Sequence, residues 1–500
     1  MKIAFRTDAS SQIGTGHFMR CLTLADELKK QGVHIRFISR NLPPHLSEML
    51  SEKAMEYMPL STDATQERID ELAHSSWLGT SQTQDAQATV KALASQLWDW
   101  IVVDHYALDL RWERTIRANC KNLMVIDDLA DRQHDCDVLL DQNYYADMQT
   151  RYIDKVPEHC QLLLGPRYAL LREEFRTLRE KIKVRTGDVK KILVFFGGVD
   201  AGNYTSLAIQ ALAELNSRQQ VDVVIGAHHP NREDIQQSCV YHGFICHVQT
   251  VSMAELMAEA DLAIGAGGTA TWERCCLGLP TINFCLADNQ RKLIGDGASV
   301  GLFYAPISGR ALLEVIRDHL RNLLENPSLI KLISEGAIKF VDGKGTLRVA
   351  SAMGIGSIEI KRASNKDLKN FFDWRNHPKI RAASINSALI SWDEHQRWFE
   401  QVLADKNREL IIGMAEDKTV GVVRFDIEND LAEVSIYLIQ EAGFVGQGRN
   451  LLLSAERWLN ANRPEIRRIR ASVLAENKAS KNLFLASSYH ESKIYYQKDL

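Results

Sequence analysis

The alternation of apolar and polar positions divides the first two thirds of the chain into short apolar runs separated by amphipathic stretches. The stretch FMRCLTLADELKKQG at 18–32, for example, places apolar residues at helical spacing and ends on a glycine. Strand-length runs that alternate with helices predict a parallel sheet with helices on both faces. The strands of this first series are expected at 1–8, 34–40, 99–106, 122–128 and 136–142.

A second alternating series follows a polar helical connector at 162–182. Two Rossmann-like halves, 1–165 and 166–345, are therefore expected. Ligands of such sheets bind beyond the carboxyl ends of the strands, so we expect a ligand in the cleft between the halves. The strands of the second half are expected at 190–200, 221–229, 243–249, 261–268 and 280–286.

The pattern changes in a third domain, expected at 357–500. Apolar alternations at 409–439, broken by short polar turns, predict consecutive antiparallel strands. A glycine loop at 443–448 leads into a long amphipathic helix, and a strand ending at Asn477 precedes a last helix. This order is typical of an α+β fold and differs from a third Rossmann half.

Composition and charge narrow the class of protein. Apolar residues make up 45% and charged residues 25% of the chain, as in globular domains, and the net charge of −4 argues against a nucleic-acid partner. No apolar run reaches membrane-spanning length and no signal peptide opens the chain, so we expect a cytoplasmic protein without a membrane partner. The nine cysteines form neither a disulfide framework nor a ligand cluster, so no metal is expected. The oligomeric state stays open.

A glycine loop directly follows the first expected strand. Gly14, Thr15 and Gly16 permit a ligand to approach the backbone, and the helix that follows offers unpaired N–H groups to an anion. His17 opens that helix. The positive helix terminus disfavours an imidazolium, so this histidine is expected to stay neutral and able to accept a proton. A phosphate loop, a tight turn and a catalytic base all fit these residues.

Polar residues also follow other expected strands. Asp104 and Tyr106 come at the carboxyl end of a buried strand, on the side of the cleft, although a helix cap and a turn explain them equally well. In the second half Gly198 follows one strand, and Gly268 opens a helix that carries Glu273 one turn further in. There a carboxylate can accept both hydroxyls of a ribose while loop amides hold phosphate. Two such clusters favour a nucleotide-diphosphate ligand.

The first two domains resemble the UDP-sugar hydrolases of pseudaminic acid biosynthesis, which are related in fold to the GT-B glycosyltransferases. The resemblance covers about residues 1–340 and implies loss of UDP from UDP-2,4-diacetamido-2,4,6-trideoxy-β-L-altropyranose by hydrolysis at the anomeric carbon. It rests on GTGHFMRC, DHYALD, IDDLADRQHDCDVLLDQN, LLGPRYALLREEF, FFGGVDAGNYT and GAGGTATWERCCLGLPTINFCLADNQ.

The resemblance also implies roles for single residues. His17 matches the catalytic histidine of that family and would take a proton from the attacking water, while Asp104 and Tyr106 beside it in the catalytic site would line the sugar pocket. A GT-B glycosyltransferase is the alternative; the first half shows no apolar or basic acceptor-facing patch, which favours water as the nucleophile. The implied substrate-binding residues are Gly14, Thr15, Gly16, Gly198, Gly268, Thr269, Glu273, Asn289 and Gln290.

Residues 357–500 resemble the GNAT acetyltransferases, in particular the branch that acetylates ribosomal-protein alanines and pseudaminic-pathway aminosugars. DWRNHPKIR, SWDEHQRWFEQ, GFVGQG and ENKASKNLF carry the resemblance, which implies acetyl-CoA as cosubstrate. Gly443 stands where that family usually has Gln or Arg, and Phe484 where many members have a general-acid tyrosine. Glu433 is a candidate base, although a solvated carboxylate fits it as well. The implied coenzyme contacts are Val445, Gly446, Gly448, Arg449, Asn477 and Ser480.

The expected architecture is therefore α/β, with two Rossmann-like halves of GT-B type followed by an α+β GNAT-like domain. Acetylation of the 4-amino group and removal of UDP are consecutive steps of one pathway, so the two resemblances together predict a bifunctional enzyme acting on a small UDP-aminosugar. A hydrolase with a non-catalytic acetyl-CoA-binding module and a UDP-sugar-binding scaffold are the alternatives. The sugar stereochemistry and the final glycan, flagellin included, stay open.

Overall fold

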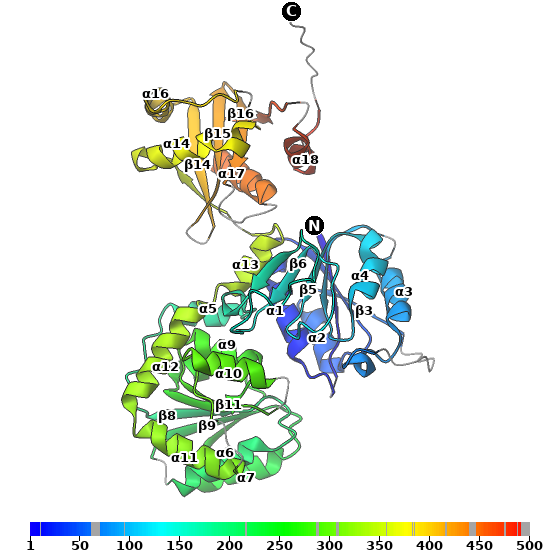
Figure 1. Cartoon of the computed structure of the whole chain (residues 1–500), viewed down its shortest axis with the longest axis vertical. Helices are drawn as coiled ribbons and strands as arrows, with labels where there is room; N and C mark the ends of the chain where they lie inside the picture. The colour runs from blue at the N-terminus through cyan, green and yellow to red at the C-terminus, as the bar shows by residue number, and fades with distance from the viewer. Residues whose placement is uncertain are drawn as a thin grey trace, which may run out of the picture. The chain divides into compact units, whose positions relative to one another are not determined.

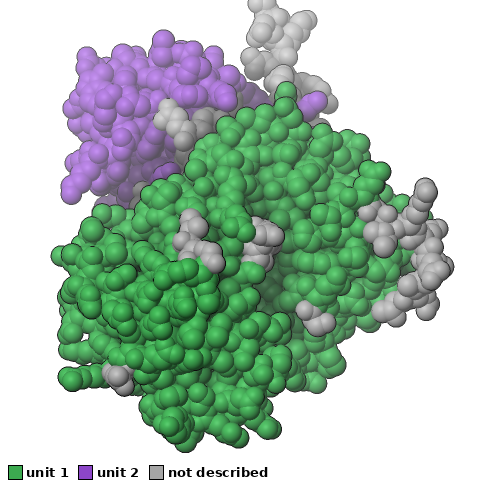
Figure 2. Space-filling view, turned by 60° about the horizontal axis from the view of Figure 1, so that its bottom comes forward, with its two compact units in different colours: residues 1–349 green, residues 350–500 purple. Residues whose placement is uncertain are grey.

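The structure is a computed structural model in which the chain forms two compact units, Met1–Val349 and Ala350–Leu500 (Figures 1 and 2). The first unit contains both predicted Rossmann-like halves, coloured blue to cyan and green in Figure 1, and the second contains the predicted α+β domain. The structure describes residues 1–10, 12–61, 71–94, 96–215, 218–286, 290–306, 310–356, 358–382, 384, 386–415, 418–439, 447–474, 477–487 and 489–491.

The first half is built on a seven-stranded sheet whose neighbouring strands are all parallel, in the order β3-β2-β1-β4-β5-β6-β7. The order reverses between β1 and β4, which is the doubly wound arrangement. The strands are β1 Lys2–Thr7, β2 His34–Ser39, β3 Glu56–Pro59, β4 Trp98–Asp104, β5 Cys120–Ile126, β6 Val138–Asp141 and β7 Gln161–Leu164. The helices are α1 Gly16–Lys30, α2 Pro44–Glu52, η1 Ser75–Leu78, α3 Gln82–Ala92, α4 Leu110–Ile116 and η2 Arg117–Asn119.

Two elements of this half differ from the expectation. The sequence pattern does not mark β3, because this edge strand is largely exposed and has no apolar alternation. The start of the expected helical connector is the strand β7, which pairs with β6, and helical structure in the connector amounts to η3 Pro166–Tyr168 and α5 Glu173–Arg179.

The second half repeats the arrangement with a five-stranded parallel sheet in the order β10-β9-β8-β11-β12, which reverses between β8 and β11. Its strands are β8 Lys191–Phe195, β9 Gln220–Ile225, β10 Ile245–Val248, β11 Leu262–Ala266 and β12 Thr281–Phe284. Its helices are α6 Tyr204–Glu214, α7 Arg232–His242, α8 Met253–Glu259, α9 Thr269–Cys276, α10 Arg291–Ser299, α11 Leu312–Leu324, α12 Pro327–Phe340 and α13 Gly345–Ala352.

The second unit is an α+β domain around a five-stranded sheet in the order β13-β14-β15-β16-β17. The first four strands are antiparallel neighbours, and β17 runs parallel to β16. Its strands are β13 Glu359–Arg362, β14 Arg408–Ala415, β15 Lys418–Glu428, β16 Leu431–Leu438 and β17 Arg468–Arg470. Its helices are η5 Asn365–Asp367, α14 Leu368–Asn376, α15 Pro378–Ala382, α16 Trp392–Ala404, α17 Gly448–Asn462 and α18 Lys478–Ala486. The fold class predicted from the sequence is confirmed, except that the last strand ends at Arg470 and not at Asn477.

All nine cysteines lie outside disulfides, and most are buried in the cores of the first unit. Cys285, directly after β12, is exposed. The buried thiols therefore pack as small apolar side chains.

Candidate functional site

The loop that carries His17 lies where the strand order of the first sheet reverses. The strands β1 and β4 are neighbours, with Thr7 opposite Asp104 at their carboxyl ends. The chain leaves β1, turns at Gly14 with a φ of +78°, and enters α1 at Gly16 with Thr15 as the N-cap. This route brings His17 on α1 next to Asp104 on β4. Side chains separated by 87 positions in the chain thus meet at the point where ligands of doubly wound sheets bind.

His17 and Asp104 form a buried hydrogen-bonded pair. The imidazole Nδ1 lies 2.5 Å from the Asp104 carboxylate, and 3.3 Å from the nearest guanidinium nitrogen of Arg20. The shorter contact assigns the Nδ1 proton to a hydrogen bond donated to Asp104. In that tautomer Nε2 carries the lone pair and can accept a proton. His17 is 9% exposed, whereas the Asp104 side chain has no exposed surface.

Arg20 keeps Asp104 ionised. Its Nε lies 2.5 Å from one carboxylate oxygen and its Nη2 lies 2.7 Å from the other, which is a bidentate contact. Burial opposes ionisation of Asp104, but Arg20 and His17 together hold the pKa of this carboxyl well below its usual range. Because Asp104 is enclosed by these partners, it does not line the sugar pocket as predicted. Its contact with this part of the site is the hydrogen bond from His17.

Asp128 adds a second carboxylate to this cluster. It accepts a hydrogen bond from Arg20 Nη1 at 3.2 Å and another from the Tyr106 hydroxyl. Burial and the neighbouring Asp128 charge raise the pKa of Tyr106 well above its usual value. Arg20 thus contacts two carboxylates, those of Asp104 and Asp128.

Aromatic rings enclose the exposed edge of His17. The Tyr106 ring lies edge-on at 4.5 Å between centroids, and Trp77 stacks on Tyr106 at 5.6 Å. His74 lies 4.6 Å from Trp77, and burial lowers its pKa, so it stays neutral near pH 7. Aromatic faces of this kind suit the apolar face of a sugar ring.

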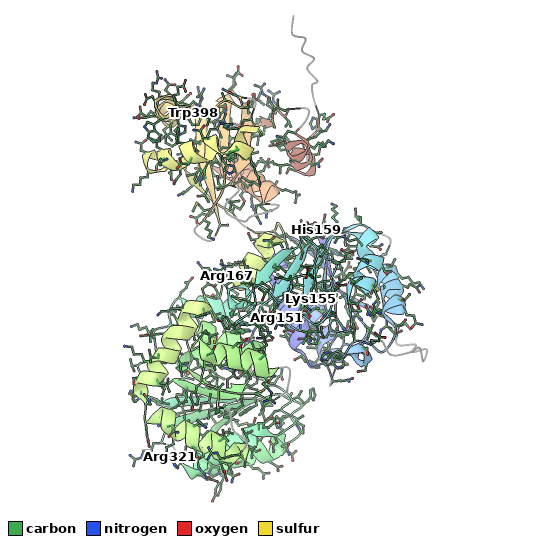
Figure 3. The ribbon with its side chains drawn as sticks, viewed as in Figure 1. Arg151, Lys155, His159, Arg167, Arg321 and Trp398 are labelled. Atoms are coloured by element: carbon green, nitrogen blue, oxygen red, sulfur yellow. The ribbon has the colours of Figure 1, made fainter. Side chains whose placement is uncertain are left out.

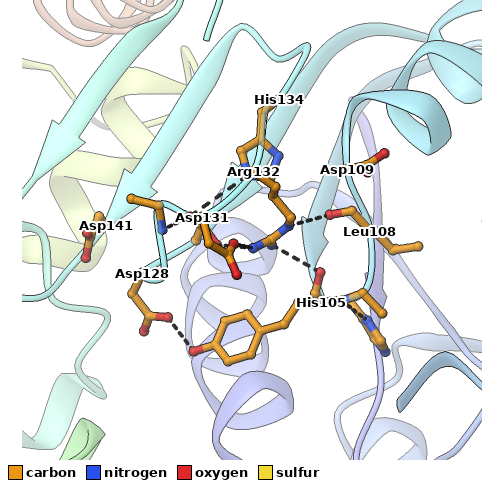
Figure 4. Close-up of polar contacts among 12 residues, drawn as sticks. His105, Leu108, Asp109, Asp128, Asp131, Arg132, His134 and Asp141 are labelled. Carbon is orange, nitrogen blue, oxygen red and sulfur yellow. Dashed lines mark hydrogen bonds and ion pairs between the residues drawn. The ribbon is translucent and has the colours of Figure 1, made fainter. Parts of the chain in front are cut away.

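The segments that carry Tyr106 and Asp128 are held by two arginines. Arg132 donates to the Leu108 carbonyl at 2.8 Å and contacts the Asp131 carboxylate at 2.9 Å, as Figure 4 shows. Arg151, labelled in Figure 3, donates to the backbone carbonyl of Asp128 at 2.8 Å. These contacts tie the backbone on both sides of the site to neighbouring segments.

The predicted nucleotide residues gather at the strand-order reversal of the second sheet, between β8 and β11. Gly198 follows β8, and its carbonyl accepts the Gly226 amide at 3.1 Å. Gly268 is the N-cap of α9 with a φ of +129°, and Thr269 is the first residue of that helix. A Cβ at Gly268 would meet nothing within 4 Å, so this face of the loop is open.

Glu273 and Gln290 lie beside this loop. Glu273 is one turn into α9, with Arg172 Nη2 at 3.5 Å, and burial raises the pKa of its carboxyl. Gln290 contacts the Gly267 carbonyl through Nε2 at 3.4 Å. Asn289 lies outside the described residues. Gly268, Thr269, Glu273 and Gln290 therefore lie around the N-terminus of α9, whereas Gly198 contacts Gly226 after β9.

The structure describes four of the six coenzyme contacts predicted in the second unit, namely Gly448, Arg449, Asn477 and Ser480. Gly448 and Arg449 begin α17, and Asn477 is the N-cap of α18, where its Oδ1 accepts the Ser480 amide at 3.0 Å. Val445 and Gly446 lie outside the described residues, as does Gly443. The strands β16 and β17 pair at only three positions, from Leu431–Arg468 to Glu433–Arg470, although β16 continues to Leu438.

The candidate acid and base of this unit are held by neighbours. Phe484 is buried in the core, and the Tyr489 ring lies 5.0 Å from it with its hydroxyl donating to Glu456 at 2.8 Å. Glu433 is bound by Arg470 at 2.9 Å and by the Ser472 hydroxyl at 2.7 Å. The hydrogen bond from Ser472 is the strongest of the interactions that lower the pKa of Glu433. The lowered pKa makes this carboxylate a weaker base.

Four residues of the site around His17 were not predicted from the sequence: Arg20, Asp128, His74 and Trp77. Arg20 lies three residues after His17 on the same helix face, a spacing that could have drawn attention to it. Asp128 comes two residues after β5, at the carboxyl edge that carries Asp104. Trp77 lies in the short helix η1 and His74 is its N-cap, and no sequence pattern marks either residue.

Neither a membrane-spanning helix nor a metal cluster is found in the described part of the chain. No helix there is long and apolar enough to cross a membrane. No group of three or more His, Cys, Asp or Glu side chains among those residues is arranged to hold a metal ion.

Family models match two parts of the chain. Residues 191–334 match the glycosyltransferase family 28 C-terminal domain, and residues 358–487 match the acetyltransferase (GNAT) domain. Together with the two sheet topologies, these matches confirm the predicted fusion of a GT-B-like unit with a GNAT domain.

Three relatives cover the chain to different extents. An uncharacterized protein of Methanocaldococcus jannaschii is 24% identical over 99% of this chain and 97% of the relative. UDP-2,4-diacetamido-2,4,6-trideoxy-beta-L-altropyranose hydrolase of Campylobacter jejuni is 26% identical over 58% of this chain and 94% of that enzyme. The acetyltransferase PseH of the same bacterium is 24% identical over 27% of this chain and 85% of that protein. The same two-part organisation therefore spans a single chain in another organism.

Proposed function

We propose that the first unit hydrolyses a UDP-sugar at its anomeric carbon, with His17 as the general base. The observation that carries this proposal is the His17–Asp104 pair, which fixes the imidazole with Nε2 ready to accept a proton. Water would form its bond to C1 as the bond from C1 to the diphosphate oxygen breaks. The electron pair leaves with UDP, and the proton of the water passes to Nε2.

The substrate would span the first unit. The aromatic residues around His17 would contact the sugar, while the amides at the start of α9 would hold the diphosphate and Glu273 the ribose. We propose UDP-2,4-diacetamido-2,4,6-trideoxy-β-L-altropyranose as this substrate, because an enzyme of that name is similar to the chain.

The second unit is proposed to acetylate the 4-amino group of the preceding UDP-aminosugar with acetyl-CoA. The amide-rich start of α17 would receive the coenzyme pyrophosphate, and the short β16–β17 pairing leaves an edge of β16 for the pantetheine chain. The coenzyme would supply the acetyl group, whose carbonyl carbon the free amine attacks with departure of the thiolate. The attacking amine loses one proton to solvent water as the amide forms. Because Phe484 has no hydroxyl, water is also the proposed proton donor to the departing thiolate.

The test uses the purified full-length chain with UDP-4-amino-4,6-dideoxy-N-acetyl-β-L-altrosamine, with and without acetyl-CoA. Thiol release that depends on the sugar, followed by free UDP, is the expected result. Release of UDP from the pre-acetylated sugar without any thiol release would remove the acetyltransferase and leave a coenzyme-binding module.

Two controls separate hydrolysis from glycosyl transfer and assign the base. In ¹⁸O-labelled water the label should enter the sugar and not UDP, because the C1–O bond breaks; UDP release only on addition of an acceptor would indicate a transferase. His17→Ala should abolish UDP release, whereas His159→Ala, at an exposed histidine of the same half (Figure 3), should not alter it.

A further inference from the structure

Arg274 is a buried cation beneath the loop at the start of α9. It lies in the second turn of that helix and is 1% exposed. Its side chain runs back toward the helix N-terminus, where Nη2 donates to the Ala266 carbonyl at 2.7 Å. The same nitrogen lies 3.3 Å from the Thr271 hydroxyl and 3.3 Å from the Asn283 amide oxygen.

Three features make this placement unfavourable in the ligand-free protein. Among the described residues no carboxylate forms an ion pair with Arg274, and its hydrogen-bond partners are all neutral. Its Nε and Nη1 are buried without a partner. The charge also lies at the positive end of the α9 dipole, where a cation is disfavoured. Burial accordingly lowers the pKa of Arg274 to about 10.

Arg185 shows how the same half accommodates a buried arginine without an ion pair. Its guanidinium donates to the carbonyls of Met257 and Ala258 at the end of α8, and to the Leu277 carbonyl at the end of α9. Helix C-termini carry partial negative charge and favour a cation at this place. Burial lowers the pKa of Arg185 to about 10, as it does that of Arg274, so the two residues differ in their partners and not in their pKa. Arg185 and Arg274 are thus both buried, but at opposite ends of helix dipoles.

We propose that Arg274 is an anion-positioning residue, and that a phosphate-bearing ligand at the amides of Gly268 and Thr269 supplies the negative charge the buried guanidinium lacks. Arg274 does not touch the ligand in this account. Arg274 acts in two ways: its hydrogen bond fixes the Ala266 carbonyl at the start of the loop, and its positive charge lies behind the loop amides. The open face at Gly268 leaves room for a phosphate at hydrogen-bond distance from the loop amides.

This inference deepens the proposed function and rests on it for the identity of the ligand as a nucleoside diphosphate. When the C1–O bond breaks, its electron pair remains on the diphosphate, so the negative charge at the loop increases during the reaction. A fixed cation behind the amides then binds the departing diphosphate more strongly than the intact substrate. Arg274 would therefore favour the bond-breaking step as well as binding.

The test measures binding of UDP, UMP, uridine and inorganic pyrophosphate to the full-length chain by calorimetry. Arg274→Met should lower the affinity for UDP and for pyrophosphate at least tenfold and leave the affinity for uridine unchanged. The melting temperature of the ligand-free protein should stay equal or rise, because an unpaired buried charge is removed. Arg185→Met, the matched control, should lower the melting temperature without selective loss of the phosphate-bearing ligands.

Two more variants separate charge from hydrogen bonding. Arg274→Lys keeps the charge and should retain most of the UDP affinity, whereas Arg274→Gln keeps donors without charge and should lose it. An equal loss of uridine and UDP in Arg274→Met, or UDP affinity unchanged in Arg274→Gln, would overturn the inference.

The outcomes also distinguish this inference from the proposed function. If the wild-type chain binds pyrophosphate in an Arg274-dependent way but releases no UDP from the sugar nucleotide, the proposed function fails and the anion site stands. If the chain hydrolyses the substrate and Arg274→Gln binds UDP normally, the inference alone fails. A wild-type chain that binds neither UDP nor pyrophosphate would refute the anion site.

Discussion

The indole Nε1 of Trp272 donates a hydrogen bond of 2.9 Å to the side-chain oxygen of Asn143. Trp272 lies on α9 in the second half, and Asn143 follows β6 in the first. Asn143 Nδ2 in turn donates to Asp128 at 3.0 Å, and Asp128 binds Arg20 beside the His17–Asp104 pair. A continuous chain of hydrogen bonds therefore joins the helix of the candidate nucleotide site to the candidate base.

Trp272→Phe should weaken both the fold and the reaction. The Asn143 oxygen would remain buried without its donor, at a cost of about 1–3 kcal/mol in the free energy of unfolding. Denaturant unfolding and kcat/KM for UDP release measure the two effects. Trp112→Phe is the matched control, since that buried indole donates to Asp85 away from this chain of hydrogen bonds. If both variants lose the same activity per folded molecule, the Trp272 contact does not position the site.

Asp104→Asn should slow UDP release by about 10²–10⁴-fold, because the amide no longer fixes the imidazole tautomer or stabilises its protonated form. The loss should appear in kcat/KM for UDP release measured on the purified variant. Asp128→Asn leaves the contact between His17 and Asp104 in place and should cause a smaller loss. Equal rates for wild type and Asp104→Asn would show that this carboxylate does not position the base.

Stability in acid should depend on Asp127. Burial opposes its ionisation, but Arg132 and His134 lower its pKa to about 2. A carboxyl whose folded pKa is lowered stabilises the fold above its unfolded pKa and ceases to do so as pH falls through the folded value. The stability difference between wild type and Asp127→Asn should therefore be about 2 kcal/mol at pH 7 and shrink between about pH 4 and pH 2. Urea unfolding at several pH values measures it, and a constant difference would contradict the assignment.

Nucleotide affinity should fall in mild acid because of Glu273. Burial raises the pKa of this carboxyl, so it becomes protonated at a higher pH than an exposed glutamate and then accepts ribose hydroxyls poorly. Glu273→Gln should bind UDP about tenfold more weakly, with little dependence on pH. The 2′-deoxy analogue of UDP should be less sensitive to the substitution. Equal sensitivity of UDP and its deoxy analogue would place Glu273 away from the ribose.

Asn477 offers a test that separates helix capping from coenzyme binding. Asn477→Ala removes the hydrogen bond to the Ser480 amide and should cost about 1 kcal/mol of stability, whereas Asn477→Ser keeps a capping oxygen. If the amide also contacts the coenzyme, both variants should raise the KM for acetyl-CoA. A KM that rises only in Asn477→Ala would reduce the role of this residue to capping.

The sequence predicts the strands of both sheets well wherever they are buried, because such strands form continuous apolar runs. It misses β3 and β7, the two edge strands of the first sheet. β3 is largely exposed, and the apolar run of β7 continues directly into the sequence pattern of the expected helical connector. The loop residues of the site could be predicted because Gly14 and Gly268 must adopt positive φ.

The environment of His17 could not be predicted in the same way. The polarity of the helix alone favours a neutral imidazole. The fold, however, brings Asp104 from the end of β4 and Asp128 from the loop after β5 into one cluster with His17. Contacts between residues far apart in the chain produce no periodic pattern in the sequence. The arrangement of charges around His17 can therefore be read only from the three-dimensional structure.

The exposed Cys285 has a practical consequence. It directly follows Phe284, whose carbonyl accepts the Gly267 amide at 3.2 Å in the loop that opens α9. Most other thiols are buried, so a maleimide dye should react fastest at this position. The wild-type chain would then carry a fluorescent reporter next to its candidate nucleotide loop, and ligand titrations could be followed optically without an engineered cysteine.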